Sequence, residues 1–515
     1  MRIGLLLSAA ALLVASPAAA TWQQATSKHF IIYGDMPASE MNAYAVKLET
    51  FDAAARLVRK MPDPVVGDGN RLQVLVVPTM LDVNRLYGAA DSGIGGYYVG
   101  DVAGPFLVTP LKSRQILDYR RLTPETVFFH EYTHHLQLQN SNRPMPTWLV
   151  EGFAEFLSNP IFGADGSIGL GTPATQRAET LLKGRWAPIE DLISGDAISV
   201  SYSGFWIQNY AQGWLMNHYL AFEPSRRGQI DAYVERITKG EKSLDAAKAV
   251  FGDLGKLDSE LRSYVHVKRF PYLKINSAKL SIAPVTVTTL PAGADEAMMS
   301  RIQVKTGYGS VSKGYVLTKV KDIARRYPGD LLVQRTLAEV AYDNKDYAQS
   351  EAASDAALKI DPRSTEAMVY KGRSYLARAK KSQSAEEFKT ARQWFLEANK
   401  IDREDPEPLY LYYRTYRAAN QAAPKSAIDA LTYATLLAPR DSIVASSLVV
   451  EYLRQKNLKA AADAIRPVAY RPDLGQTKDN KPYTVLKLIE AGDGPGALKL
   501  AEKELLPKQD ADNPS

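Results

Sequence analysis

The sequence has 515 residues, with 63 lysines and arginines against 57 aspartates and glutamates and no cysteine. The lack of cysteine excludes disulfide bridges and thiolate ligands, so any metal site must use histidines and carboxylates. This length predicts two or three domains with ample core. Because the net charge of +6 is a mild excess without long runs, we expect no nucleic-acid partner. The densest basic cluster is typical of a solvated helix face: Lys371, Arg373, Arg378, Lys380 and Lys381.

The first twenty residues have the pattern of a secretory signal peptide. Arg2 is a short basic region, Gly4 to Ala15 is apolar, and the stretch ending at Ala20 offers small residues for cleavage. The apolar run is too short to cross a bilayer, and no later stretch is long and apolar enough to do so. We therefore expect an exported protein, periplasmic or secreted, with no membrane span after signal cleavage.

Residues 21–270 are expected to form an α+β domain that begins with alternating strands and helices. Strands are predicted at 29–33 and 71–77, with an amphipathic helix between them. Two more are predicted around a glycine-rich turn, at 95–99 and 105–109. Because the last of these directly precedes the most informative helix, we expect it to be an edge strand that pairs with an extended peptide.

That helix is predicted from Thr123-Pro124-Glu125, which supply a capping hydroxyl, an initial proline and an acid in the first turn, to about Gln139. It contains His130-Glu131-Tyr-Thr-His134. Two histidines four residues apart lie on one helix face, about one turn apart, so both imidazoles can reach one ion. Glu131 lies on the flank of that face, where it can hold a metal-bound water. The pattern indicates a zinc hydrolase site.

A second helix, starting near Thr147, carries Trp148-Leu-Val-Glu151-Gly152-Phe-Ala-Glu155. Together the two helices resemble gluzincin metallopeptidases, the group that includes thermolysin and the aminopeptidase-N-type enzymes. The resemblance implies a zincin-like domain with a small mixed sheet and active-site helices. It also implies that Glu151 joins His130 and His134 as the third Zn²⁺ ligand. Glu131 would then be the catalytic base, and Glu155 would accept a hydrogen bond from the far nitrogen of one histidine.

The same resemblance implies a downstream tyrosine or histidine that stabilises the oxyanion of the reaction intermediate. We prefer Tyr210, which opens a predicted helix able to line the cleft, and place Tyr202 second; His218 and Tyr219 are further candidates. His135 points about 100° away from His134 and is expected to be a packed or surface residue. His29 and His266 show no partner pattern.

The last part of the chain shows an internal repeat. A linker at 271–300 is expected, then helical repeats at 301–505 and a disordered tail at 506–515. Asp346 to Pro362 resembles the second helix of a tetratricopeptide repeat. Small residues recur where repeat helices pack: Ser350 and Ala357, Ala391 and Ala398, and Ala427 and Ala434. An all-α solenoid is therefore predicted, with a generic helical bundle as the alternative, and such repeats typically bind a protein partner.

The sequence thus predicts an exported zinc metallohydrolase followed by a tetratricopeptide-like domain. The Gly-x-Met-Glu-Asn segment by which aminopeptidases grip a free amino terminus is absent, so we expect an endopeptidase acting on peptide or protein substrates. Two alternatives remain open. One is a catalytically inactive zincin-fold protein whose repeats bind or scaffold, against which the intact Glu131 argues. The other is a zinc hydrolase of non-peptide amides, because the water chemistry is shared.

Overall fold

The computed structural model describes residues 21–89, 94–112, 123–139, 145–195, 205–470 and 479–506. The predicted signal peptide, Tyr202 and residues 507–515 of the predicted tail lie outside these ranges. Within them the chain is a mixed α+β structure, with a small sheet and many helices. None of the described helices is long and apolar enough to span a membrane.

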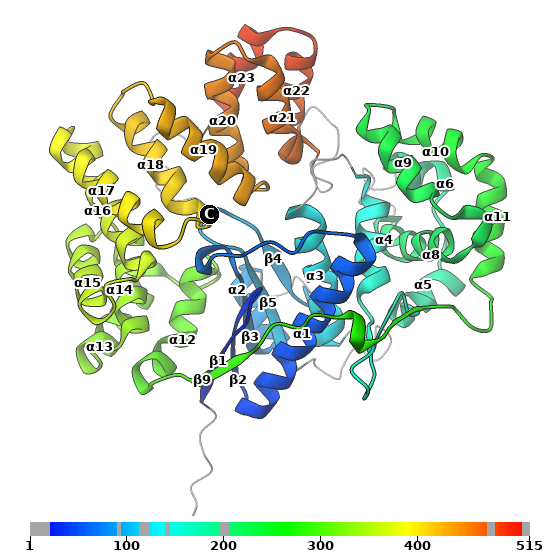
Figure 1. Ribbon diagram of the computed structural model, residues 1–515, viewed down its shortest axis with the longest axis horizontal. Coiled ribbons are helices and arrows are strands. Elements are labelled where there is room, and N and C mark those ends of the chain that lie inside the picture. The colour runs from blue at the N-terminus through cyan, green and yellow to red at the C-terminus, as the bar shows by residue number, and fades with distance from the viewer. Residues whose placement is uncertain are drawn as a thin grey trace, which may run out of the picture.

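A six-stranded mixed sheet lies at the centre of the molecule (Figure 1). Its strand order is β4-β5-β3-β2-β1-β9. The three central strands β5, β3 and β2 are parallel, and the pairings of β4 with β5, β2 with β1 and β1 with β9 are antiparallel. The strands are β1 (Trp22–Thr26), β2 (Phe30–Asp35), β3 (Leu72–Thr79), β4 (Tyr97–Val99), β5 (Phe106–Lys112) and β9 (Thr286–Thr289).

The edge of this sheet beside the predicted metal helix is β4. Val108 of β5 pairs with Tyr97 on one side and with Leu75 of β3 on the other, so β5 is an internal strand. The prediction that residues 105–109 form the edge is therefore wrong. β5 is internal because β4 and β5 form a hairpin, in which β4 pairs antiparallel along the outer side of β5. Strand propensity locates both strands but says nothing about their order across a sheet.

Helices cover both faces of the sheet, as the side chains of β3 illustrate. Val74 and Val76 are buried in a core shared with α1 (Ala38–Arg59) and α3 (Pro124–Gln139). On the opposite face, Leu75 and Val77 are buried against α2 (Met80–Tyr87) and α12 (Ala292–Lys305). Burial on both faces explains why this strand reads as an unbroken apolar run.

A helical layer follows the sheet and completes the first core. The predicted helix that starts near Thr147 is present, and Tyr210 lies in a further helix. The elements of this layer are α4 (Thr147–Leu157), α5 (Ala178–Lys183), α6 (Ile189–Ser194), α8 (Gln208–Phe222), α9 (Gln229–Thr238), α10 (Ser243–Phe251) and α11 (Leu254–Tyr264). A three-stranded sheet of order β6-β7-β8 lies against them, made of Ile161–Phe162, Ile168–Leu170 and Leu273–Ile275.

The segment predicted as a linker, 271–300, is instead part of the folded core. β8 pairs with β7, β9 pairs with β1, and α12 begins at Ala292. The prolines that suggested a linker lie between these elements. The strands in this segment are short, and their pairing partners are up to 266 residues away in sequence, so no local pattern reveals them.

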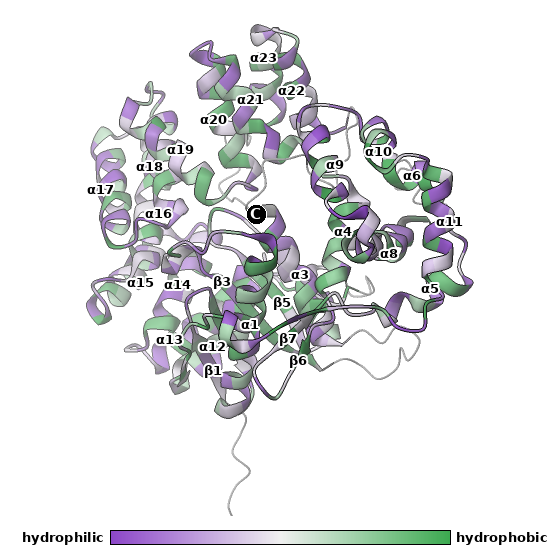
Figure 2. Ribbon diagram, turned by 45° about the vertical axis from the view of Figure 1, so that its right-hand side comes forward, coloured by the Kyte–Doolittle hydropathy of each residue, from purple (hydrophilic) through white to green (hydrophobic). Residues whose placement is uncertain are grey.

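The remaining helices form consecutive antiparallel pairs that curve along one side and over the top of the sheet in Figure 1. Hydrophilic and hydrophobic residues alternate along them (Figure 2). The predicted small positions are fully buried, for example Ser350, Ala391 and Ala427. The helices are α13 (Lys313–Arg326), α14 (Leu331–Asp343), α15 (Tyr347–Ile360), α16 (Thr365–Ser382), α17 (Ala385–Ile401), α18 (Pro406–Ala418), α19 (Lys425–Leu437), α20 (Ser442–Arg454), α21 (Leu458–Ala469), α22 (Lys481–Glu490) and α23 (Gly494–Glu504).

One member of the basic cluster departs from the expected solvated face. Arg373 is only 5% exposed. Its guanidinium pairs with Glu407 of α18 and lies over the rings of Tyr342 and Tyr370. Burial is possible because the neighbouring repeat supplies the carboxylate, which the spacing of basic residues along one helix does not reveal.

Candidate metal centre

Three of the predicted ligands converge on one point between α3 and α4. The Nε2 atoms of His130 and His134 are 3.1 Å apart. Oε2 of Glu151 lies 3.3 Å from the first and 3.4 Å from the second. The cluster meets the geometry of a metal-binding group, with its ligand atoms all within 4.8 Å of one another. The i, i+4 spacing on α3 and the first turns of α4 bring these atoms together, as the sequence predicted.

The start of α3 is fixed by the cap that the sequence predicted. The backbone N–H of Thr126 donates to the side-chain oxygen of Thr123 at 3.0 Å. On the face of α3 opposite the two histidines, Phe128, Phe129 and Tyr132 are buried in the core that α3 shares with α1 and the sheet. This apolar face holds the helix in place and turns His130 and His134 toward α4.

The position of Glu151 depends on a close crossing of α4 and α8. A Cβ on Gly152 would lie 2.2 Å from the carbonyl carbon of Gly213, and one on Gly213 would lie 2.6 Å from the carbonyl oxygen of Trp148. Trp148 is fully buried and packs on Tyr233. The Trp-Leu-Val-Glu-Gly pattern therefore has a packing cause: the tryptophan anchors α4, and the glycine allows the backbone contact.

The far nitrogen of His130 is oriented by Glu155. Nδ1 of His130 lies 3.3 Å from Oε1 of Glu155, as the resemblance implied for one of the histidines. Glu155 is 1% exposed and is held in turn by two residues that sequence reasoning did not find. Arg177 contacts its Oε1 at 2.5 Å, and Gln176 donates to its Oε2 at 2.7 Å. Both lie in the short helix η2 (Thr175–Arg177), which carries no motif of its own.

Electrostatics around the cluster favour a positive charge at its centre. Burial lowers the pKa of His130, but contacts with Glu151 and Glu155 outweigh it and raise that pKa to about 10. Burial raises the pKa of Glu155, whereas Arg177 and His130 bring it down to about 2. Burial also opposes ionisation of Glu151, yet both histidines hold its pKa well below the usual range. Two carboxylates are thus kept ionised around an imidazole pair.

Glu131 lies within the electrostatic field of the same cluster. Burial raises the pKa of its carboxyl, the two histidines lower it, and Glu151 and Glu155 raise it further; the net shift is upward. A raised pKa makes a carboxylate a stronger base, which is the property that proton abstraction from water requires.

The donor set fits Zn²⁺. Two imidazole nitrogens and one carboxylate oxygen are a common catalytic zinc set that leaves a further position open. Oε2 of Glu151 is buried and has no hydrogen-bond partner within the described part of the chain. An unsatisfied buried carboxylate oxygen facing two imidazoles costs free energy unless a cation lies between them.

Of the four oxyanion candidates, Tyr210 lies at the cluster. Its ring stacks on that of His130, with centroids 5.8 Å apart, and Arg177 lies 4.9 Å from its centroid. Burial, with Glu151 and Glu131 nearby, raises the pKa of its hydroxyl, so it remains a proton donor at neutral pH. His218 instead contacts Tyr264 and backbone carbonyls, and Tyr219 donates to Glu260. Tyr202 lies outside the described residues.

His135 of α3 and His29, which directly precedes β2, contact neighbouring side chains outside the cluster. His135 lies between Tyr98, whose hydroxyl is 3.1 Å from its Nδ1, and the ring of Tyr132, so its predicted packing role is confirmed. His29, to which the sequence assigned nothing, contacts Glu49 and Asp63 at 2.7 and 2.8 Å.

A second group of potential ligands, formed by His29, Glu49 and Asp52, lies behind α3. Asp52 accepts hydrogen bonds from Arg56 at 2.8 and 2.9 Å and from Tyr132 at 2.6 Å. Because arginine already neutralises this carboxylate, the group is a buried ion-pair network that supports α3 through Tyr132.

Comparisons with known proteins add little to this site. No protein-family model matches the chain, and no curated protein matches it. Among solved structures, the chain is similar to one described as "MamA RS-1 ArsTM double mutant", with 22% identity and a TM-score of 0.27. That similarity covers 34% of this chain and 94% of the other.

Proposed function

We propose that this protein is an exported zinc metallopeptidase of the gluzincin type that cleaves within peptide chains. The observation that carries the proposal is the convergence of His130, His134 and Glu151. Glu131 lies on the flank of that helix face, close enough for both histidines to affect its pKa. Zinc at this point would supply a Lewis acid that activates water and polarises a carbonyl. Periplasmic or secreted location follows from the N-terminal signal pattern.

Each neighbouring residue has a distinct task in this proposal. Glu131 takes a proton from the attacking water and passes it to the leaving amine. Tyr210 donates a hydrogen bond to the developing oxyanion. Glu155, held by Arg177, orients the ring of His130 through its Nδ1.

The edge strand β4 is the surface on which an extended substrate would lie. Tyr98 of β4 contacts His135 of α3, so the strand runs beside the helix that carries His130 and His134. No described strand pairs with its outer side, which is the side on which β-augmentation would add a substrate strand. Such pairing binds peptide backbone irrespective of side chains, and it favours a peptide over other amides. The helical repeats would bind a protein partner or present the substrate.

Metal analysis and cleavage profiling test the proposal. The purified protein should contain about one zinc per chain, and His134→Ala should lose it, because three ligands define a catalytic zinc site. Glu131→Gln should retain zinc and lose hydrolysis, measured as new termini in a proteome-derived peptide library. Equal zinc in wild type and His134→Ala would refute the site. Zinc without any peptide cleavage in the wild type would point to a non-peptide amide or to a scaffold.

A further inference from the structure

The turn between β4 and β5 is inserted into the helical repeats. Val102, three residues beyond the end of β4, is fully buried. Its neighbours belong to the repeat core and include Tyr410 of α18, Leu431 of α19 and Leu448 of α20. An aliphatic side chain at a turn tip is normally exposed, and burying one stabilises the structure because apolar surface is removed from water. Val102 therefore anchors the β4–β5 turn to the helical repeats.

The backbone of this turn is bound by a helix cap of the repeats. Oδ1 of Asp441 accepts from the N–H groups of Ile443 and Val444, both at 2.9 Å, and caps α20. Oδ2 of the same carboxylate accepts from the N–H of Val102 at 2.9 Å. Asp441 is only 5% exposed. One side chain thus joins the start of a repeat helix to the end of the edge strand.

A second loop of the first domain docks in the same manner. The N–H of Gly69, in the short helix η1 (Asp68–Asn70), donates to Oδ2 of Asp402 at 2.9 Å. Asn70 donates to the carbonyl oxygen of Leu437 at 3.3 Å. A Cβ on Gly104, whose φ is +100°, would lie 3.0 Å from the carbonyl oxygen of Gly69, so the two loops pack together. They contact the repeats as one unit.

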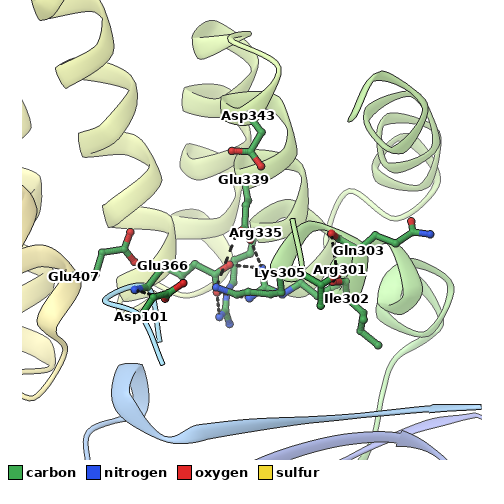
Figure 3. A network of polar contacts seen from close by, with 12 residues as sticks. Asp101, Arg301, Ile302, Gln303, Lys305, Arg335, Glu339, Asp343, Glu366 and Glu407 are labelled. Carbon is green, nitrogen blue, oxygen red and sulfur yellow. Dashed lines mark hydrogen bonds and ion pairs between the residues drawn. The ribbon is translucent and has the colours of Figure 1, made fainter. Parts of the chain in front are cut away.

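Figure 3 shows Asp101, at the base of the turn, beside a network of ion pairs between repeat helices. Arg301 of α12 donates to Glu339 of α14 at 3.0 Å and pairs with Glu366 of α16. Arg301 and Glu339 are buried, so this network fixes α12, α14 and α16 relative to one another beside the turn.

The other end of β4 contacts the metal helix. A Cβ on Gly95 or Gly96 would lie 2.9 or 2.7 Å from the side chain of Val127 in α3. Tyr98 contacts His135 of the same helix. A continuous path of contacts therefore runs from α20 through Val102 and β4 to the helix that carries His130 and His134.

We propose that α18–α20 form a clamp for the β4–β5 hairpin and thereby position the edge strand, with Asp441 and Val102 as positioning residues. The occupant of this repeat surface is the chain's own hairpin, and a separate partner would bind elsewhere on the repeats. The role of β4 in holding a peptide rests on the proposed function. The clamp itself does not.

Asp441→Asn tests the contact with the hairpin while it preserves the helix cap of α20. Asparagine is as good a helix cap as aspartate, so its Oδ1 can still cap α20. Its amide nitrogen, however, would face the N–H of Val102 as a second donor. Asp493→Asn is the matched control, since Asp493 caps α23 with an Oδ1 that accepts from Gly496 at 2.8 Å and no described contact joins it to the first domain. Val102→Ala tests the apolar anchor separately.

The measurement is hydrogen exchange of the full-length chain as purified, followed in fragments that cover residues 95–104. Asp441→Asn and Val102→Ala should each speed exchange there at least tenfold, with helix circular dichroism unchanged. Unchanged exchange in both variants, matching Asp493→Asn, would overturn the clamp. If the wild type cleaves peptides, the two variants should also raise KM at least threefold with kcat within twofold. Faster exchange in a protein without peptidase activity would retain the clamp and refute the proposed function.

Discussion

Gly152 of α4 and Gly213 of α8 bring the backbones of these helices into direct contact. A Cβ added to Gly152 would lie 2.2 Å from the carbonyl carbon of Gly213, a separation that no relaxation of side chains can relieve. Because Glu151 precedes Gly152, this crossing decides where the carboxylate of Glu151 lies relative to His130 and His134. The proposed metal centre thus depends on a helix contact that contains none of its candidate ligands.

Gly152→Ala should destabilise the protein and weaken its zinc binding. The added methyl must push α4 away from α8, and overpacking of this kind costs about 1–3 kcal/mol, occasionally more. Chemical unfolding and zinc competition with a chelator measure the two effects. Gly314→Ala is the control, because no atom lies within 4 Å of a Cβ at that position in α13, and it should be neutral or slightly stabilising. Equal stability of the two variants would contradict the crossing.

Glu155→Gln should lower zinc affinity about 10- to 100-fold, the usual effect of losing an outer carboxylate that orients a ligating histidine. Glutamine keeps the shape but loses the charge that balances Arg177 and supports His130. Competition with a chromogenic chelator provides the measurement. Glu179→Gln, at an exposed position of α5 paired with Lys183, should leave the affinity unchanged. Identical affinities in both variants would remove Glu155 from the orienting role.

Tyr210→Phe should reduce kcat about 10²–10³-fold if its hydroxyl stabilises the oxyanion, a loss typical of removing one such donor. Zinc affinity should stay within twofold, because the ring that stacks on His130 is retained. Steady-state kinetics on a quenched peptide and metal analysis give the two values. Tyr219→Phe, which removes a hydroxyl bound to Glu260 outside the centre, is the control. A threefold or smaller change in kcat would reassign the donor.

The docking of the hairpin should weaken as the pH rises toward 7. Burial, with the nearby carboxylate of Asp441, raises the pKa of Asp101 to about 7, and Lys305 opposes this shift only in part. In the unfolded chain the same carboxyl ionises near its usual value of about 3.9. Between these two values the unfolded state loses its proton first, so the folded state becomes progressively less stable and the effect is complete above pH 7.

Asp101→Asn removes this titration while its Oδ1 can still accept from the N–H of Ala103, as Asp101 does at 2.9 Å. The urea midpoint of the variant, relative to wild type, should therefore be higher at pH 8 than at pH 5. Comparing the two proteins at each pH cancels the titration of all other groups. The same difference at both pH values would show that Asp101 does not titrate in this range.

The convergence of His130, His134 and Glu151 was predictable because the information for it is local. Histidines at i and i+4 share a helix face in any environment, and Thr123 caps its helix through the residues that follow it. The spacing of small residues such as Ala391 likewise marks helix packing before any partner is known. Periodicity and capping act over one or two turns, so a single chain reveals them.

Other parts of the candidate site and of the fold were not predictable, because they depend on contacts between segments far apart in the sequence. Arg177 and Gln176 reach Glu155 from a short helix without a motif, and β4 rather than residues 105–109 is the edge strand.

The sequence by itself determined which residues can ligate zinc and which segments are helices, because those properties depend on neighbours within a turn or two. Only the tertiary structure decided the strand order, the incorporation of residues 271–300 into the core and the burial of Val102 under Asp441. These depend on contacts between segments as much as 339 residues apart, for which composition and spacing carry no signal.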